Sequence, residues 1–285
     1  MAAVLLTGAC RVEPRATVAV ERRPDGLLGV PLVVNGSVIQ AVLDTGAERT
    51  VLALGTADRL RLRRDEWVST DIEGAGGRDR RRLGRPDSLA LGGLVLRRRT
   101  VAADNSVVVG PLPGGVEALL GQDMLSPYDL DLDASAGRLV LMAVDGCTGR
   151  FLPWQARYEA IAAWRPVRNV LAVPMQLGAA ALWAQLDTGA ARSVITLPGM
   201  IALGLGTGGS ATIRGFGAGS APARVQRFTV RIGGLPATDT DMLVSPLHTL
   251  RSLGALLGAD WLAGRHVWIS WATDQVFVQT GPALR

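Results

Sequence analysis

The feature that most constrains this chain is a twelve-residue stretch that occurs twice. The first copy, AVLDTGAERTVL, covers residues 41–52, and the second, AQLDTGAARSVI, covers residues 184–195. The aspartates at their centres, Asp44 and Asp187, are 143 residues apart, and their neighbours keep that spacing. A chain that carries the same carboxylate twice, each time at the end of an apolar run, is predicted to fold as two similar units.

The similarity continues on both sides of the aspartates. Upstream, GVPLVVNGSVIQAVLD (29–44) matches AVPMQLGAAALWAQLD (172–187), and each segment is typical of a strand, a tight turn and a second strand that ends at the aspartate. The downstream matches are DIEGAGG with TIRGFGAG, LALGGLVL with VRIGGLPA, ALLGQDML (118–125) with ALLGADWL (255–262), and LDLDASAGRLVL with VWISWATDQVFV. The spacing drifts only at loops, where insertions are tolerated.

Short apolar segments separated by glycine-rich turns dominate both copies, which favours an all-β fold. The chain has 285 residues, of which 48% are apolar, so each half has both the length and the apolar content to bury a core. We predict an N-terminal lobe over residues 16–142, a linker over 143–158 and a C-terminal lobe over 159–285. No apolar run reaches the roughly 18 residues expected of a membrane-spanning helix.

The basic residues are all arginine, and the formal net charge is +5. Many of them gather in three runs, at residues 61–64, 78–82 and 97–99. A nucleic-acid surface would need aromatic residues among the arginines for base stacking, and these runs contain none. We therefore interpret the runs as solvated loops and strand edges, and expect no nucleic-acid partner.

The two cysteines, Cys10 and Cys147, lack the CxxC spacing of zinc sites, and we expect neither a metal nor another cofactor. Cys10 follows MAAVLLTGA, which resembles the end of a bacterial lipoprotein signal with Cys10 as the lipidated residue. A frayed N-terminus explains residues 1–15 equally well. Lipidation would anchor the protein facing the periplasm and leave Cys147 without an obvious disulfide partner; otherwise a periplasmic or a cytoplasmic location stays open.

Together these motifs resemble the retropepsin-like aspartic proteases. The resemblance rests on Asp-Thr-Gly-Ala after an apolar strand, a glycine-rich hairpin downstream and Leu-Leu-Gly before a short helix, and it covers both copies. Viral retropepsins usually pair two identical chains, whereas pepsins carry both lobes in one chain. The resemblance implies a bilobal β-barrel with a pseudo-twofold axis, and a monomer that acts as a pseudo-dimer on a polypeptide substrate.

The family chemistry explains the duplication, because one aspartate supplies only half of a site. Two carboxylates about 3 Å apart cannot both ionise cheaply, so they share one proton and provide a base and an acid together. We therefore expect Asp44 and Asp187 to form a catalytic dyad that activates water for peptide hydrolysis. Pepsin-like sites place a hydroxyl after Asp-Thr-Gly, where this chain has Ala47 and Ala190. The loss of that hydrogen bond predicts an active range closer to neutral pH.

The residues beside each aspartate have implied roles as well. Glycine allows a sharp turn that brings backbone N–H groups against a carboxylate, and the family threonines bond across the lobe interface. The active-site loop residues predicted in this way are Thr45, Gly46, Ala47, Thr188, Gly189 and Ala190. The predicted flaps, which would cover an extended substrate, have their tips at Gly74, Ala75, Gly76, Gly215, Phe216 and Gly217.

The chain also departs from the family. Arginine often follows Leu-Leu-Gly in these proteases, but this chain has Gln122 and Ala259 there. The contacts of that arginine at the lobe interface must therefore be replaced or absent. The leading hypothesis is an aspartic endopeptidase. The alternatives are a catalytically inactive peptide-binding protein of the same fold and, on the arginine runs alone, a protein associated with nucleic acid.

Overall fold

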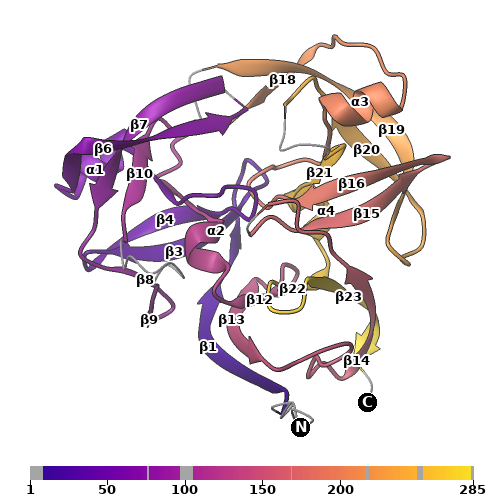
Figure 1. Cartoon of the computed structure of the whole chain (residues 1–285), viewed down its shortest axis with the longest axis horizontal. Coiled ribbons are helices and arrows are strands. Elements are labelled where there is room, and N and C mark those ends of the chain that lie inside the picture. The colour runs from indigo at the N-terminus through magenta and orange to yellow at the C-terminus, as the bar shows by residue number, and fades with distance from the viewer. Residues whose placement is uncertain are drawn as a thin grey trace, which may run out of the picture.

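The computed structural model describes residues 9–75, 77–96, 105–167, 169–215, 219–248 and 253–283. Its strands form two lobes joined by a sheet to which both contribute, which confirms the predicted all-β bilobal class. Figure 1 shows the first lobe in violet, the second in orange, and the shared sheet between them at the end of the molecule that carries both termini. No helix in these ranges is long and apolar enough to cross a membrane.

The first lobe is built on a ten-stranded sheet. Its strands are β2 (Glu21–Arg22), β3 (Leu28–Val34), β4 (Ser37–Leu43), β5 (Val51–Ala53), β6 (Arg63–Gly74), β7 (Gly77–Arg85), β8 (Leu89–Leu91), β9 (Leu94–Val95), β10 (Val107–Gly110) and β11 (Ala118–Leu120), with the short helices α1 (Leu54–Arg59) and α2 (Gln122–Leu125). The β3–β4 hairpin turns at Asn35 and Gly36, both with positive φ, as a tight Asn-Gly hairpin turn requires.

The second lobe repeats this plan on a seven-stranded sheet. Its strands are β15 (Ala172–Leu177), β16 (Ala180–Leu186), β17 (Val194–Ile195), β18 (Ala211–Arg214), β19 (Ser220–Ile232), β20 (Thr238–Val244) and β21 (Ala255–Leu257), with helices α3 (Leu197–Ala202) and α4 (Ala259–Leu262). In each lobe the strand that ends at the aspartate lies parallel to the Leu-Leu strand, with Ala41 opposite Ala118 and Ala184 opposite Ala255. The sequence repeat is therefore also a repeat of strand pairing.

A six-stranded sheet joins the lobes, in the order β1-β13-β12-β22-β23-β14. Its strands are β1 (Arg11–Ala19), β12 (Asp129–Asp133), β13 (Arg138–Asp145), β14 (Ala156–Ala162), β22 (His266–Ser270) and β23 (Gln275–Ala283). At its centre Asp131 of β12 pairs with Trp268 of β22, its own counterpart in the second copy. The pseudo-twofold axis that relates the lobes therefore passes through this pair.

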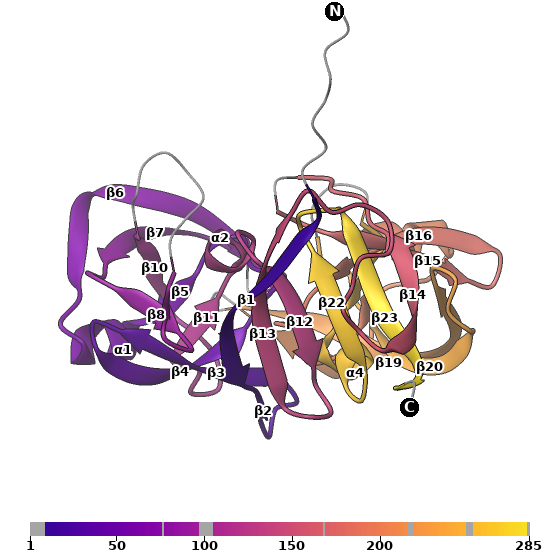
Figure 2. The same cartoon turned by 90° about the horizontal axis from the view of Figure 1, so that it is seen from below.

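The N-terminal region differs from its prediction. Residues 11–15, for which the sequence left either a signal segment or a frayed terminus open, lie in β1, which pairs with β13 over its length. Cys10 forms a disulfide with Cys147, a bond between residues 137 positions apart. Figure 2 shows β1, the strand that follows Cys10, alongside β13 in the shared sheet. A sulfur in a disulfide cannot carry a lipid, so the predictions of a lipidated Cys10 and of an unpartnered Cys147 are wrong for this structure.

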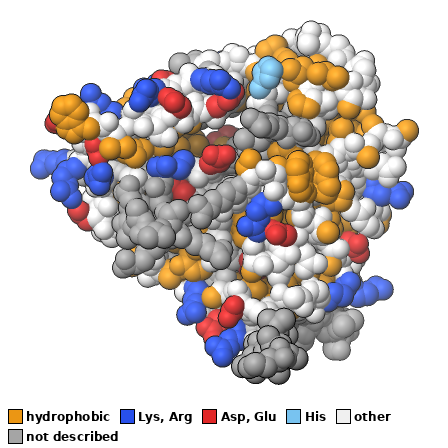
Figure 3. Space-filling model, viewed as in Figure 1, with side chains coloured by type: hydrophobic (Ala, Val, Ile, Leu, Met, Phe, Trp, Pro, Cys, Tyr) orange, Lys and Arg blue, Asp and Glu red, His pale blue; other side chains and the backbone are white. Residues whose placement is uncertain are grey.

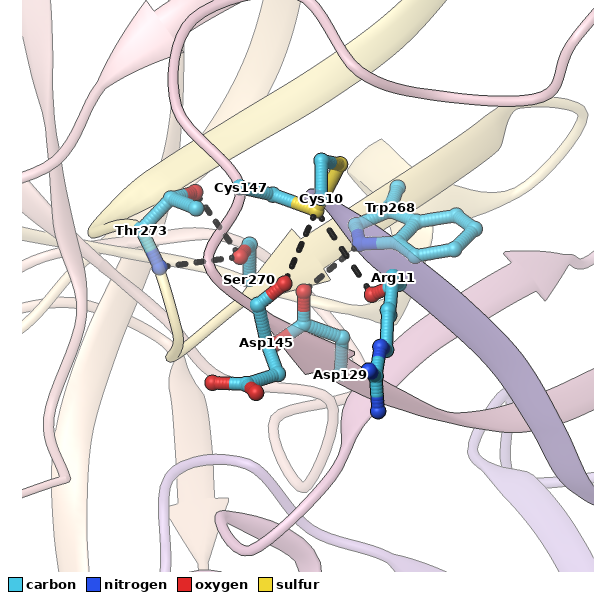
Figure 4. Close-up of a disulfide and its surroundings, with 8 residues drawn as sticks. All are labelled: Cys10, Arg11, Asp129, Asp145, Cys147, Trp268, Ser270 and Thr273. Carbon is cyan, nitrogen blue, oxygen red and sulfur yellow. Dashed lines mark hydrogen bonds between the residues drawn. A yellow bond between two sulfur atoms is a disulfide. The ribbon is translucent and has the colours of Figure 1, made fainter. Parts of the chain in front are cut away.

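Cys147 lines a pocket at the shared sheet together with Asp129 and Asp145, and Figure 4 shows the disulfide and its surroundings. The Sγ atom of Cys147 contacts the carbonyl oxygens of Arg11 and Asp145, at 3.6 and 3.5 Å. Beneath it the buried Asp129 accepts a hydrogen bond of 3.0 Å from the indole of Trp268. The predicted linker is also shorter than expected, since β13 runs to Asp145 and β14 begins at Ala156.

Candidate active site

The two aspartates stand at equivalent strand ends, where the chain leaves β4 and β16. The backbone N–H of Asp44 donates to the carbonyl of Leu120 at 3.0 Å, and that of Asp187 donates to Leu257 at 2.9 Å. The Leu-Leu strand of each lobe thus fixes the position of its own aspartate. The side chain of Asp44 is buried and that of Asp187 is half-buried.

Each carboxylate faces the loop of the opposite lobe. A Cβ atom added to Gly46 would lie 2.2 Å from Oδ1 of Asp187, and one added to Gly189 would lie 2.4 Å from Oδ1 of Asp44. Any side chain at either position would overlap a carboxylate, so only glycine fits. The structure therefore brings the two predicted aspartates together across the lobe interface.

Backbone amides hold both carboxylates in place. Oδ1 of Asp44 accepts from the N–H groups of Gly46 and Ala47, at 2.9 and 2.8 Å. Oδ1 of Asp187 accepts from Gly189 and Ala190, at 3.0 and 3.1 Å. Each aspartate keeps its second oxygen free of these amides, which leaves that oxygen available for other contacts.

The threonines bond reciprocally across the interface. The N–H of Thr45 donates to Oγ1 of Thr188 at 2.9 Å, and the N–H of Thr188 donates to Oγ1 of Thr45 at 3.1 Å. Each hydroxyl then donates onward to a carbonyl of the opposite lobe, Thr45 to Leu186 at 2.9 Å and Thr188 to Leu43 at 2.6 Å. Both threonines are buried, so the loss of any one of these hydrogen bonds leaves a polar atom without a partner.

Burial raises the pKa of both carboxyls. The pKa of Asp44 rises to about 6 and that of Asp187 to about 8, in both cases chiefly because the folded chain removes water from the charged form. The negative charge of Asp44 raises the pKa of Asp187 further, while the amides of Gly46 and Ala47 limit the rise at Asp44. The two groups titrate as a pair, which holds one proton between the two transitions.

A second set of hydrogen bonds lies behind the aspartate loops, and it was not predicted from the sequence. The carboxylate of Asp123 accepts from the N–H and hydroxyl of Thr50, at 2.8 and 2.7 Å, and Asp260 accepts from the N–H and hydroxyl of Ser193, at 2.9 and 2.7 Å. These clamps tie each aspartate loop to the helix after Leu-Leu-Gly. The signal was present, because the repeat aligns Thr50 with Ser193 and Asp123 with Asp260.

Gln122 stands at a position where the family often has arginine, and a second glutamine, Gln185, lies on β16. The side-chain amide of Gln122 is buried and donates to the carbonyl of Thr45 within its own lobe. The crossing contact comes from Gln185, whose Nε2 donates to the carbonyl of Gly46 at 3.3 Å. The contact across the interface is therefore replaced from β16, one strand away from the expected position.

The two flap hairpins approach each other above the aspartates. β6 and β7 form the first flap, with Gly74 opposite Gly77, and β18 and β19 form the second. A Cβ atom added to Gly215 would lie 2.8 Å from that of Ala75, so the tips meet. Figure 3 shows a hollow between the lobes below these strands. The predicted tip residues Gly76, Phe216 and Gly217 lie outside the described residues.

The arginine runs of the first lobe form ion pairs on exposed strand faces. Arg63 pairs with Asp87 at 3.0 Å, and Arg78 pairs with Glu73 at 3.0 Å across the flap hairpin. Further pairs join Arg64 to Asp58, Arg81 to Asp79, and Arg85 to Asp65. The run at 97–99 lies outside the described residues. The predicted absence of a nucleic-acid partner stays a prediction.

Comparison with known proteins supports the resemblance to retropepsin-like aspartyl proteases. Residues 30–127 match a family model described as gag-polyprotein putative aspartyl protease. This segment runs from β3 through the first aspartate loop and flap to the residues just after α2. No curated protein matches the chain.

Proposed function

We propose that this retropepsin-like chain is an aspartic endopeptidase in which Asp44 and Asp187 act as one catalytic pair. The observation that supports this most strongly is the mutual approach of the aspartates and the opposite glycines, with Cβ positions only 2.2 and 2.4 Å from carboxylate oxygens. Two carboxyls so close, both with a raised pKa, favour a state that holds one proton. That state contains a base and an acid side by side.

The reaction follows from the shared proton. The ionised carboxylate takes a proton from a water molecule as the water oxygen attacks the peptide carbonyl carbon, and the protonated carboxyl gives its proton to the carbonyl oxygen. The resulting tetrahedral diol then collapses. One hydroxyl proton returns to the pair, a proton passes from the pair to the leaving nitrogen, and the C–N bond breaks. The pair ends with one proton, ready for another cycle.

Substitution of each aspartate by asparagine tests this proposal. Asp44→Asn and Asp187→Asn should each reduce cleavage of casein or of a peptide library by about 10²–10⁴-fold, because either change removes the shared-proton state. The double variant should be no worse than either single one. Most of the turnover surviving in either variant would contradict a site that needs both lobes.

Stability serves as the control for folding. A carboxyl whose pKa is raised in the folded state opposes folding above its unfolded pKa, near 3.8, because the unfolded chain ionises more readily. Asparagine removes that cost. The Asp187→Asn variant should therefore melt at a higher temperature than the wild type at neutral pH, with the difference vanishing below the unfolded pKa. An inactive peptide-binding protein would show this stabilisation too, but its wild type would cleave nothing.

We further propose that the active species is a single chain. Both halves of the site lie in one polypeptide, so activity per mole should stay constant on dilution. A loss of specific activity at low protein concentration would indicate that two chains form the site.

We also propose that the protein resides in an oxidising compartment, the periplasm of a bacterium. The Cys10–Cys147 disulfide supports this, because such bonds persist outside the reducing cytosol. Protein taken directly from its native cells should react with a thiol-alkylating reagent only after reduction. Alkylation of both cysteines without reduction would contradict the location.

A further inference from the structure

A cavity of about 230 Å³ lies where the second lobe meets the shared sheet, and neither aspartate lines it. Its walls come from β19, β20, β21, α4 and β23. The inner wall is apolar and includes Val230, Ile232, Leu235, Met242, Leu257 and Val278. An apolar cavity of about 150 Å³ in another protein is large enough to bind benzene. This cavity therefore has room for a small aliphatic group together with a polar head.

One wall of the cavity carries a cation, the half-buried Arg265. Its guanidinium lies 5.1 Å from the ring centroid of Trp261 and donates to the carbonyl of that residue. Burial lowers the pKa of Arg265, a sign that its charge is partly removed from water. An arginine in such a place is well suited to bind an anion, since a guanidinium offers five donors in a planar fork.

No carboxylate of the described residues forms an ion pair with Arg265. The acid whose charge acts on it is Asp260. The oxygens of Asp260 already accept from the N–H and hydroxyl of Ser193 and from the N–H of Trp261. Donors of the guanidinium are therefore left for a ligand.

The first lobe has no equivalent cation. The repeat places Met124 at the position of Trp261 and Tyr128 at that of Arg265. Both of these first-lobe side chains pack against the hydrophobic core. The combination of apolar wall and guanidinium thus belongs to the second lobe and is not needed to build the shared fold.

We propose that this cavity binds a short aliphatic carboxylate, with the chain against the apolar wall and the carboxylate on Arg265. The same chemistry occurs in a free fatty acid and in the C-terminal residue of a peptide that ends in leucine or valine. Recognition would rest on charge complementarity and apolar burial together. The inference does not depend on proteolysis by the aspartate pair.

Calorimetric titration and thermal melting of the full chain test the proposal. The probes are hexanoate, N-acetyl-leucine, hexan-1-ol and hexylamine. Hexanoate should bind and raise the melting temperature by mass action. Hexanol and hexylamine should bind at least about tenfold more weakly, because neither brings an anion to the guanidinium. N-acetyl-leucine stands for a peptide terminus, so its affinity relative to hexanoate identifies the source of the carboxylate.

Two variants separate the charge from the cavity. Arg265→Gln should weaken hexanoate about tenfold or more while leaving the weak binding of hexanol unchanged. Thr240→Phe, at a half-buried position of the wall, should exclude both ligands. Arg265→Lys, which keeps the charge, is the folding-matched control and should retain measurable binding. Equal affinity of hexanoate for wild type and Arg265→Gln, equal affinity of hexanol and hexanoate, or no binding at millimolar ligand would each overturn the proposal.

Discussion

The two lobes hold their aspartates with the same hydrogen bonds but differ elsewhere in the molecule. In both, two amides point at one carboxylate oxygen, a threonine bonds across the interface, and a half-buried carboxylate clamps the loop from behind. The flaps differ in length, with β6 of 12 residues and β18 of 4. The disulfide holds β1 of the first copy, and the cavity that carries Arg265 lies against the second lobe.

The contacts between the two aspartate loops limit which residues can stand in those loops. In the aspartate loops each group must fit against the opposite lobe, so one residue type serves in both copies, whereas the pair on the axis in the shared sheet, Asp131 and Trp268, has diverged. Glycine at Gly46 and Gly189 is the clearest case, because each faces the carboxylate of the other lobe. The positions after Leu-Leu-Gly tolerate a change, since Gln185 supplies the crossing contact from another strand.

Among substitutions that leave both aspartates in place, the largest effect should come from filling the contact between glycine and aspartate. Gly46→Ala and Gly189→Ala should each lower activity on the order of 10²-fold, because the new methyl would displace a carboxylate by an ångström or more. The two losses should be similar if the lobes contribute equally. Gly55→Ala is the matched control, since nothing lies within 4 Å of that position, and it should keep full activity. Retained activity in one glycine variant alone would mean that the lobes are not equivalent.

Loss of the disulfide tests a difference between the two edge strands of the shared sheet, because the bond holds the start of β1 and not β14. Cys10→Ser and Cys147→Ser should each destabilise the protein by about 2–4 kcal/mol, because the bond restrains a long segment of the unfolded chain. The two variants should match each other and the reduced wild type in melting temperature. If reduction left the melting temperature unchanged, the disulfide would contribute nothing to holding β1 on the shared sheet.

Substitution of either threonine of the interface should lower stability by less, and by a similar amount in both lobes. Thr45→Val and Thr188→Val each remove a buried hydroxyl that both donates and accepts across the interface, which should cost about 1–3 kcal/mol. Chemical denaturation would measure the loss. Thr229→Val, at an exposed strand position, should change stability by no more than about 0.5 kcal/mol. Losses that differ widely between the two buried positions would argue against a reciprocal network.

The sequence predicted the parts of the site that repeat. The aspartates, glycines and threonines recur at one spacing, so their meeting across an axis could be expected from the repeat and the family resemblance. The β3–β4 and β15–β16 hairpins followed from alternating apolar residues and small turns.

What the sequence did not predict depends on long-range pairing that leaves no local pattern. The Cys10–Cys147 bond spans 137 positions, and a single pair of cysteines does not show whether it closes. Likewise, nothing local tells that β1 pairs with β13, or that His266 lies 2.5 Å from Asp131 at the centre of the shared sheet. The clamp of Thr50 by Asp123 was visible in the repeat but resembled an ordinary helix start.

The smallest expected effect concerns pH. The pair needs one proton for activity, so cleavage should rise as pH passes the lower pKa, about 6, and fall beyond the upper one, about 8. Serine at both Ala47 and Ala190 would add a hydroxyl that donates to an ionised carboxylate and lowers the pKa, which should move the acidic limb of the kcat/KM profile downward. A wild-type optimum near that of pepsin, or an active serine variant with an unmoved acidic limb, would contradict this explanation.

The central claim is that both lobes together form one site per chain. A peptide in which a hydroxyl-bearing carbon replaces the scissile carbonyl mimics the tetrahedral intermediate and should bind tightly to the pair. Calorimetric titration should give one inhibitor per chain at every protein concentration, with binding lost in both Asp44→Asn and Asp187→Asn. Two inhibitors per chain, one per two chains, or binding that survives in either variant would contradict a single site made by Asp44 and Asp187.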